Sequence, residues 1–308
     1  MTKQLKYKNI TWIDLESPSK EELKTVVDKY KLHSLVAAEL DRPSTRSKVD
    51  VYEDYIYSIF HFPPCEVCIG AEENEDGIEE LDFVLGKDFL ITVHYTNMPQ
   101  LDELSKILET QFDVMQGRKE PHAGYLLFYI IRTIYHSLHE GLEYINLELK
   151  EIEKQVFSGH EKEMVSTLSV VNRKLIDFRW TIKSHHEILD SLEIASIDFF
   201  EPKFSFYVKT LTGEFERLWN MLESNRETFA DIRSTNESLL NIKTNEIVKT
   251  LTIMAFITFP LSVLTSTFGM NTRYLPIVGH PYDFWIILAI MFSAVGAMFT
   301  FFKFKKWL

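Results

Sequence analysis

The side chains best suited to chemistry gather in one stretch near the end of this sequence. Seven hydroxyl groups lie in a run without charge, and the run closes on Gly269-Met270-Asn271. Hydroxyl and amide oxygens can solvate polar cargo without carrying a charge themselves. The stretch offers no nucleophile–base pair, so it points to moving something through an apolar layer rather than to an enzyme. The hydroxyl residues are Thr250, Thr252, Thr258, Ser262, Thr265, Ser266 and Thr267.

A heptad-like line places several of these residues on one helical face, because alternating steps of three and four keep side chains together. Most of its members are small or polar, so several copies around an axis would make a wall compatible with water. Val248 and Leu251 would then form a dry constriction near one mouth. The alternative is that the hydroxyls only satisfy backbone carbonyls and pack between helices. The line contains Asn245, Val248, Thr252, Ala255, Phe259, Ser262, Ser266 and Gly269.

Two segments are long and apolar enough to span a membrane. Residues 250–272 contain no charge and would extend about 35 Å as a helix, and residues 284–302 would extend about 28 Å. The competing interpretation is a buried helical hairpin in a soluble core. By the positive-inside rule, the basic residues place both termini in the cytoplasm and the connecting loop outside the cell (inner) membrane. These residues are Lys243 and Lys249 before the first span and Lys303, Lys305 and Lys306 after the second.

Charge is divided unevenly along the chain. The 308 residues carry a net charge of −12, and residues 250–308 hold four basic and one acidic residue, so the first 249 residues carry −15. This acidity argues against a nucleic-acid partner, which needs clustered Lys and Arg. Cys65 and Cys68 have no second pair to complete a zinc site and are interpreted as incidental in a reducing cytoplasm.

Other candidate metal or cofactor sites are weak. His136 and His139 share a helical face with Glu140 nearby, but no third ligand is evident, so a structural role is expected. His185 and His186 are adjacent and would point apart on a helix. The sequence contains no phosphate-binding loop. We therefore expect no organic cofactor and no ATP-driven step.

The first 200 residues alternate between strand and helix patterns, and a single helical pattern then runs without Pro from 203 to Pro260. A helix over 203–268 would be about 100 Å long. It could not be stable alone and must pack against neighbours or copies. We predict strands at 9–15, 49–62, 78–85 and 89–95, and helices at about 18–31, 34–40, 100–115, 122–157, 161–194 and 203–268.

Gly269-Met270-Asn271 at the outer end of a first span, followed by a second span and a basic tail, resembles the CorA family of divalent-cation channels. The similarity extends to residues 243–252 before the span, to Pro260-Leu261 within it, and to Lys305-Lys306-Trp307-Leu308. Residues 46–55 also resemble the first strand region of that family. The resemblance therefore covers essentially the whole chain.

The resemblance implies an α+β membrane protein that assembles as a homopentamer in membrane lipid and carries Mg²⁺, with Co²⁺ or Ni²⁺ tolerated. Asn271 would form a ring at the outer mouth, Asn245 a polar ring at the inner end, and Val248 and Leu251 the hydrophobic gate. Gly269 would allow an unusual backbone angle at the helix end. The expected parts are a cytoplasmic α/β/α domain (1–200), a stalk helix (201–249), a pore-lining span (250–271), an outer loop (272–283), a second span (284–302) and a basic tail (303–308).

The resemblance also implies that intracellular Mg²⁺ regulates the channel through acidic groups between subunits. Glu214, Glu216 and Asp82 are candidates, as are residues 72–76, although stalk carboxylates are more often a solvated face. The outer loop departs from the family because it has no acid before Asp283 and places Arg273 two residues after Asn271.

Two alternatives stay open. One is a transporter of zinc or another transition metal, against which Met270 argues because that branch varies the middle residue of the tripeptide. The other is a membrane-anchored metal sensor or scaffold that conducts nothing. The sequence does not decide which metal is physiological.

Overall fold

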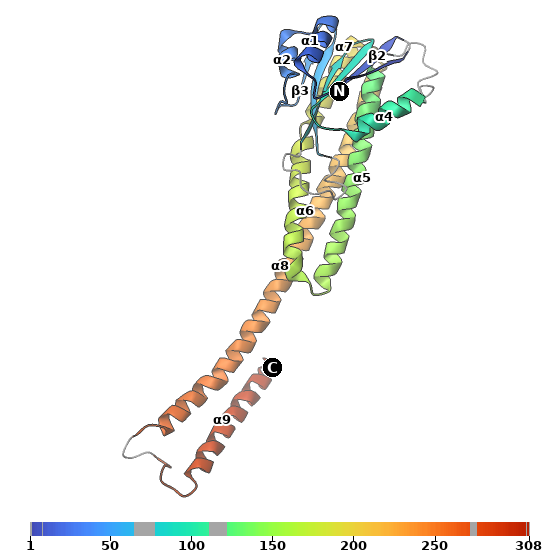
Figure 1. The fold of residues 1–308 in the computed structure, drawn as a ribbon. Coiled ribbons are helices and arrows are strands. Elements are labelled where there is room, and N and C mark those ends of the chain that lie inside the picture. Colours follow the sequence, from blue (N-terminus) through green and yellow to red (C-terminus); the bar gives the residue numbers. More distant parts are fainter. Residues whose placement is uncertain are drawn as a thin grey trace. The chain divides into compact units, whose positions relative to one another are not determined.

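The computed structural model describes residues 2–7, 9–64, 78–110, 122–271, 276–305 and 307 (Figure 1). The contacts divide the chain into two compact units, Met1–Arg233 and Ser234–Leu308. Each unit is considered by itself below. The predictions for Cys65, Cys68, residues 72–76 and Arg273 lie outside the described residues.

The first unit is built on a six-stranded sheet with the order β1-β2-β6-β5-β4-β3. Among the described strands, β2 and β6 pair in parallel, and the other four pairs are antiparallel. Every residue of β4 and β5 is buried, as expected of strands covered on both faces. The strands are β1 Thr2–Tyr7, β2 Ile10–Glu16, β3 Lys48–Val51, β4 Ile56–Phe62, β5 Glu79–Leu85 and β6 Phe89–His94.

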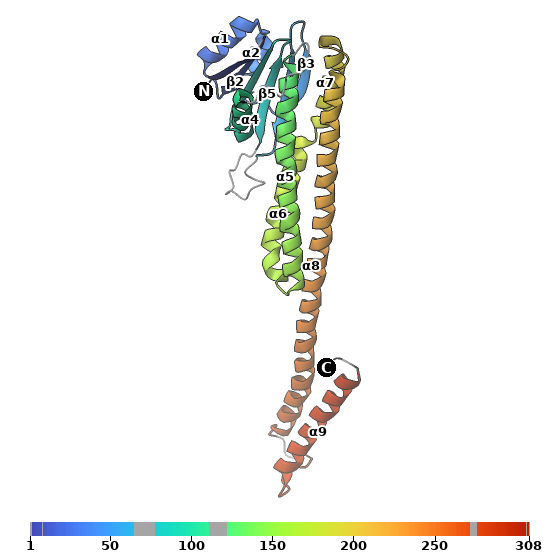
Figure 2. The same ribbon diagram turned by 90° about the vertical axis from the view of Figure 1, so that its right-hand side faces the viewer.

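Helices cover both faces of this sheet, which confirms the predicted α/β/α layers (Figure 2). On one face, α1 (Lys20–Tyr30) and α2 (Ser34–Glu39) pack on the sheet, where Val36 of α2 shares a buried cluster with Tyr57 of β4 and Ile91 of β6. Ser19 and Glu22 form a capping box that fixes the start of α1. The opposite face contacts the helical layer, which consists of α5 (Gly124–Phe157), α6 (Glu161–Ile182) and α7 (His185–Phe199). α4 spans Pro99–Thr110 and contacts α5.

Three element predictions were wrong. β1 was not predicted at all. The single strand expected at 49–62 is a hairpin, because a polar turn lets Tyr52 N–H donate to the Tyr55 carbonyl at 2.9 Å. The single helix expected at 161–194 is interrupted between α6 and α7. At that break the His185 side chain is fully buried, where its Nε2 lies 2.8 Å from the His61 carbonyl oxygen.

Two long helices complete the chain. α8 spans Ser205–Phe268, which is 64 residues, and confirms the helix predicted at 203–268 to within two residues. α9 spans Asp283–Phe304. Both are long and apolar enough to cross a membrane. Pro260 is accommodated inside α8 without ending it.

The core under the helical layer should be sensitive to truncation at Phe60. This ring is fully buried and lies between Phe62, Phe83 and His185 at centroid distances of 5.4–5.9 Å. Phe60→Ala should lower the free energy of unfolding by about 3–5 kcal/mol because it leaves a cavity. Phe157→Ala is the matched control, since that ring is 66% exposed. Denaturant unfolding of the full chain in detergent measures both, and equal effects would contradict the assignment of the core.

Candidate functional site

Within residues 234–308, one side of α8 is less exposed than the rest. Its members recur at steps of three and four, the spacing of one helical face. Ile253 is the most buried, at 8% exposure, and the others are half-buried. They are Ile253, Ile257, Pro260, Leu264 and Phe268.

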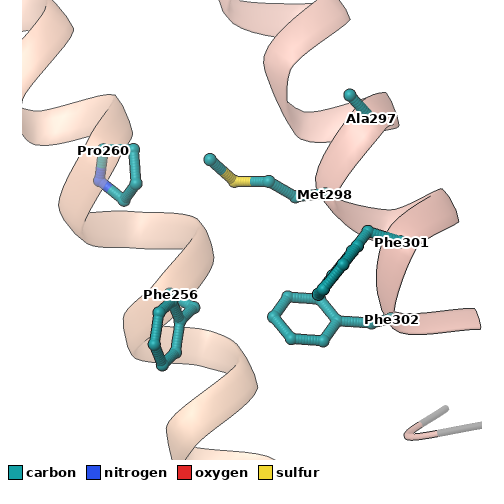
Figure 3. Close-up of a pocket in the computed structure, with 6 residues that line it drawn as sticks. All are labelled: Phe256, Pro260, Ala297, Met298, Phe301 and Phe302. Atoms are coloured by element: carbon teal, nitrogen blue, oxygen red, sulfur yellow. The ribbon is translucent and has the colours of Figure 1, made fainter. Parts of the chain in front are cut away.

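This packed face is turned toward α9. The rings of Phe256 and Phe302 meet edge to face at 6.3 Å between centroids. Beside them is an apolar gap of about 310 Å³ between the helices, into which Met298 projects from α9 opposite Pro260 (Figure 3). The gap is lined by Phe256, Pro260, Ala297, Met298, Phe301 and Phe302. The contact between the two helices is therefore apolar here.

The heptad-like line of the sequence lies on the opposite face of α8. Helical geometry at 100° per residue puts it about half a turn from the packed face. Phe259 is 72% exposed and Val248 is 53% exposed, whereas Thr252 at the border is half-buried. The exposed members are Asn245, Val248, Ala255, Phe259, Ser262, Ser266 and Gly269. The predicted line is thus one continuous surface of the second unit, with no cover from α9.

Hydroxyls on α8 bond to its own backbone. Thr252 donates to the Val248 carbonyl at 2.7 Å, and Ser262 donates to the Thr258 carbonyl at 3.0 Å. The alternative use of these hydroxyls, to satisfy backbone carbonyls, is therefore observed. It does not remove their oxygens as acceptors, because a hydroxyl that donates its hydrogen keeps its lone pairs. The result is a helix surface that can accept hydrogen bonds from water.

The tripeptide follows directly where α8 ends. Gly269 N–H still donates to the Thr265 carbonyl at 2.9 Å, and Met270 N–H to Thr267 at 3.4 Å. Gly269 does not adopt a positive φ, so the expected unusual backbone angle was wrong. What glycine supplies is space, since a Cβ would lie 3.1 Å from the Thr265 oxygen. Asn271 lies beyond the helix end and is exposed.

Asp283, the one acid of the outer loop, is used at the start of α9. Its carboxylate accepts from Gly279 N–H at 3.2 Å and from Phe284 N–H at 2.7 Å. Acids at a helix N-terminus commonly accept hydrogen bonds from free backbone N–H groups in this way. The Asp283 carboxylate is therefore already hydrogen-bonded where the loop ends and α9 begins.

At the other end of the line, the predicted constriction is apolar and open. Leu251 is 60% exposed, and Asn245 is also exposed. All residues from Asn241 to Leu251 are exposed in the single chain. Among the described residues of the second unit, α9 and the loop before it leave this apolar surface uncovered.

The regulatory candidates fall in different environments. Glu216 is exposed on α8, and Glu214 forms a 3.0 Å ion pair with Arg217. Asp82 was expected to face a second subunit. It is fully buried in β5, so that expectation was wrong. In the part of the chain that the structure describes, no group of three His, Cys, Asp or Glu residues is placed to hold a metal. His139 Nδ1 lies 3.7 Å from Glu143 Oε1 on the same helix.

Sequence reasoning missed a buried polar cluster around Asp82. Glu80 is 5% exposed on the same strand, and its Oε2 lies 3.4 Å from His61 Nε2. The available signal was two acids at alternate positions, Glu80 and Asp82, in a strand that is apolar after its first residue, Glu79, apart from them. The strand was predicted, but the face of the sheet that its acids take was not.

Comparison with known proteins gives a consistent result. The family described as CorA-like Mg²⁺ transporter protein matches residues 7–306. The cobalt/magnesium transport protein CorA of Thermotoga maritima is 24% identical over 97% of this chain and 83% of its own. That of Methanocaldococcus jannaschii is 24% identical over 97% and 92%. The complete structure of the CorA magnesium transporter from M. jannaschii superposes with a TM-score of 0.82 at 23% identity, covering 99% of this chain and 94% of that one.

Proposed function

Because the chain belongs to the CorA-like Mg²⁺ transporter family, we propose that it conducts Mg²⁺ passively inward through the cell (inner) membrane as a homopentamer. One observation carries the proposal most directly. The heptad-like line of α8, whose members are mostly small or polar, is exposed apart from the half-buried Thr252, faces away from α9 and leads to Gly269-Met270-Asn271. A surface of this kind in a membrane span requires a polar or aqueous neighbour.

An oligomer follows from the number of spans. Two helices per chain cannot enclose a path between themselves, and here their shared face is apolar. Copies of α8 must therefore face one another across an axis, with α9 outside them. The number five comes from the family resemblance.

The proposed filter acts on a hydrated ion. Mg²⁺ releases water reluctantly and usually keeps several waters when it binds. A ring of Asn271 amide oxygens would accept hydrogen bonds from those waters without removing them. A carboxylate ring would hold the ion more tightly and slow its exit. Along the wall, the outward lone pairs of Thr252 and Ser262 would serve the same hydration shell.

The gate and its control are assigned by position. Val248 and Leu251 would close the path by excluding water, which raises the barrier to a charged ion. Glu214 and Glu216 stay candidates for the ions that regulate closure. Both termini would be cytoplasmic, with the 272–283 loop outside.

Replacing Asn271 tests the filter. In vesicles with a magnesium-sensitive dye, wild type should conduct Mg²⁺ down an inward gradient. Asn271→Ala should reduce the preference for Mg²⁺ over Na⁺ at least about tenfold, or ~1.4 kcal/mol. Asn220→Ala, at an exposed position of α8 in the first unit, should leave it unchanged.

Three results would contradict this proposal in different ways. Absence of any flux at low internal Mg²⁺ would favour the sensor or scaffold. Zinc flux that needs a pH gradient, with Mg²⁺ inert, would favour the transition-metal transporter. Selective conduction by Asn271→Ala would place the filter elsewhere.

Cysteine labelling tests which face of α8 lines the path. With Cys65 and Cys68 replaced by Ser, Ser262→Cys should react with a small cationic thiol reagent about tenfold faster than Leu264→Cys, a difference of ~1.4 kcal/mol. The reason is that Ser262 lies on the exposed line and Leu264 on the packed face. High Mg²⁺ should slow only the first reaction. Equal rates would contradict the assignment of the pore wall.

A further inference from the structure

The sheet of the first unit contains two acids that its apolar surroundings do not explain. Asp82 is fully buried and Glu80 is 5% exposed. They are two residues apart on β5, so their side chains lie on the same face of the sheet. That face is the one covered by α1 and α2, away from the helical layer.

Each carboxyl has one oxygen with a donor and one without. Tyr57 O–H donates to Asp82 Oδ2 at 3.4 Å, and Ser44 N–H donates to Glu80 Oε2 at 2.6 Å. Among the described residues, Asp82 Oδ1 and Glu80 Oε1 are buried and receive no hydrogen bond. Two buried oxygens left in this way would destabilise the folded state if both groups were carboxylates, because neither oxygen regains the hydrogen bonds it loses from water.

The groups that surround the pair do not neutralise it. Lys48 is engaged by Glu39 and Asp50, and the acid of the pair that His61 contacts is Glu80. The charged and titratable groups facing the pair are Glu39 and Asp41 from α2 and the turn after it, Lys48 from β3, Tyr57 and His61 from β4, and Tyr95 after β6. An excess of negative charge therefore remains next to Asp82 if both acids are ionised.

We propose that Glu80 and Asp82 share one proton between Oε1 and Oδ1, and that this acid pair makes the packing of the first unit sensitive to pH. One carboxyl donates the shared proton and the other accepts it, which satisfies both oxygens at once. Two adjacent buried carboxyls cannot both ionise without strong repulsion. A proton fits this place better than Mg²⁺, which needs several oxygen ligands and waters.

The pKa direction agrees with this geometry. Burial first, and then the neighbouring Glu80 charge, raise the pKa of Asp82 well above its usual range, and a hydrogen bond between the two carboxyls adds to the rise. A raised pKa means that the folded state keeps its proton to higher pH than the unfolded chain does. The contribution to stability is complete below the unfolded pKa and is lost as pH rises through the folded one.

The pair is connected to the rest of the unit by hydrogen bonds. His61 Nδ1 lies 2.7 Å from Ser47 Oγ, and Ser184 Oγ lies 3.0 Å from Ser47 Oγ at the break between α6 and α7. Burial alone would lower the pKa of His61, but its bonds to Glu80 and the Ser44 carbonyl outweigh burial and raise it. Loss of the shared proton would thus disturb contacts that reach the helical layer.

Infrared spectroscopy and unfolding together test the pair in the full-length protein. Wild type at neutral pH should show the carbonyl band of one protonated buried carboxyl, and Asp82→Asn should lose it. As pH rises from neutral to alkaline, the unfolding equilibrium constant of wild type should increase more steeply than that of Asp82→Asn. The difference should be up to about tenfold per pH unit, as expected when unfolding releases one proton. Asp54→Asn, at an exposed position, should behave as wild type.

A second variant covers a folding failure of the first. Tyr57→Phe removes the hydroxyl donor that favours ionised Asp82. The band of the protonated carboxyl should therefore persist to higher pH in this variant than in wild type. A wild-type spectrum without a protonated carboxyl would overturn the proposal. So would stabilisation by Mg²⁺ that Asp82→Asn abolishes, because the pair would then hold a cation. The proposal does not depend on conduction, so loss of flux in vesicles leaves it unaffected.

Discussion

The constraint on which the second unit depends is that α8 must satisfy its own backbone and still present polar atoms to one side. An apolar layer offers no water to carbonyl or amide groups, so a spanning chain has to be helical. Hydroxyls that donate to carbonyls one turn earlier reconcile the two demands. Thr252 and Ser262 give their hydrogens to the helix and keep acceptor lone pairs at its surface. This arrangement favours water and hydrated cations, which donate hydrogen bonds to such acceptors.

Helical periodicity made much of this second unit predictable from sequence. The packed and open faces of α8 both repeat at steps of three and four, and the apolar lengths identified the two spans. Gly269 was expected at the end of the first span, but for the wrong reason. The sequence alone does not show whether a glycine is needed for an unusual φ or for room beside a carbonyl. The neutral ring attributed to Asn271 depends on copies of the chain, so no pattern within one copy could determine it.

The first unit was harder to predict where tertiary contacts decide the outcome. The turn between β3 and β4 carries Tyr52 and Tyr55, whose strand propensity hid it. The break between α6 and α7 has no Gly or Pro. It is explained by His185, which bonds to the His61 carbonyl and to Tyr135 in the core. Desolvation lowers the pKa of His185 to about 4, so its ring is neutral there and can take part in an apolar core.

The distribution of acids then follows a physical rule. Acids are scarce along the proposed path, because Asp283 is the one acid in residues 250–283 and its carboxylate is held by the start of α9. A neutral mouth binds a divalent ion weakly enough to release it. In the sheet, by contrast, a buried acid persists only if a proton or partner cancels its charge. The same side chain that would trap a cation at the mouth is tolerated at Asp82 through the proton that we propose it shares with Glu80. Burial, rather than residue type, separates an ion ligand from a proton carrier in this chain.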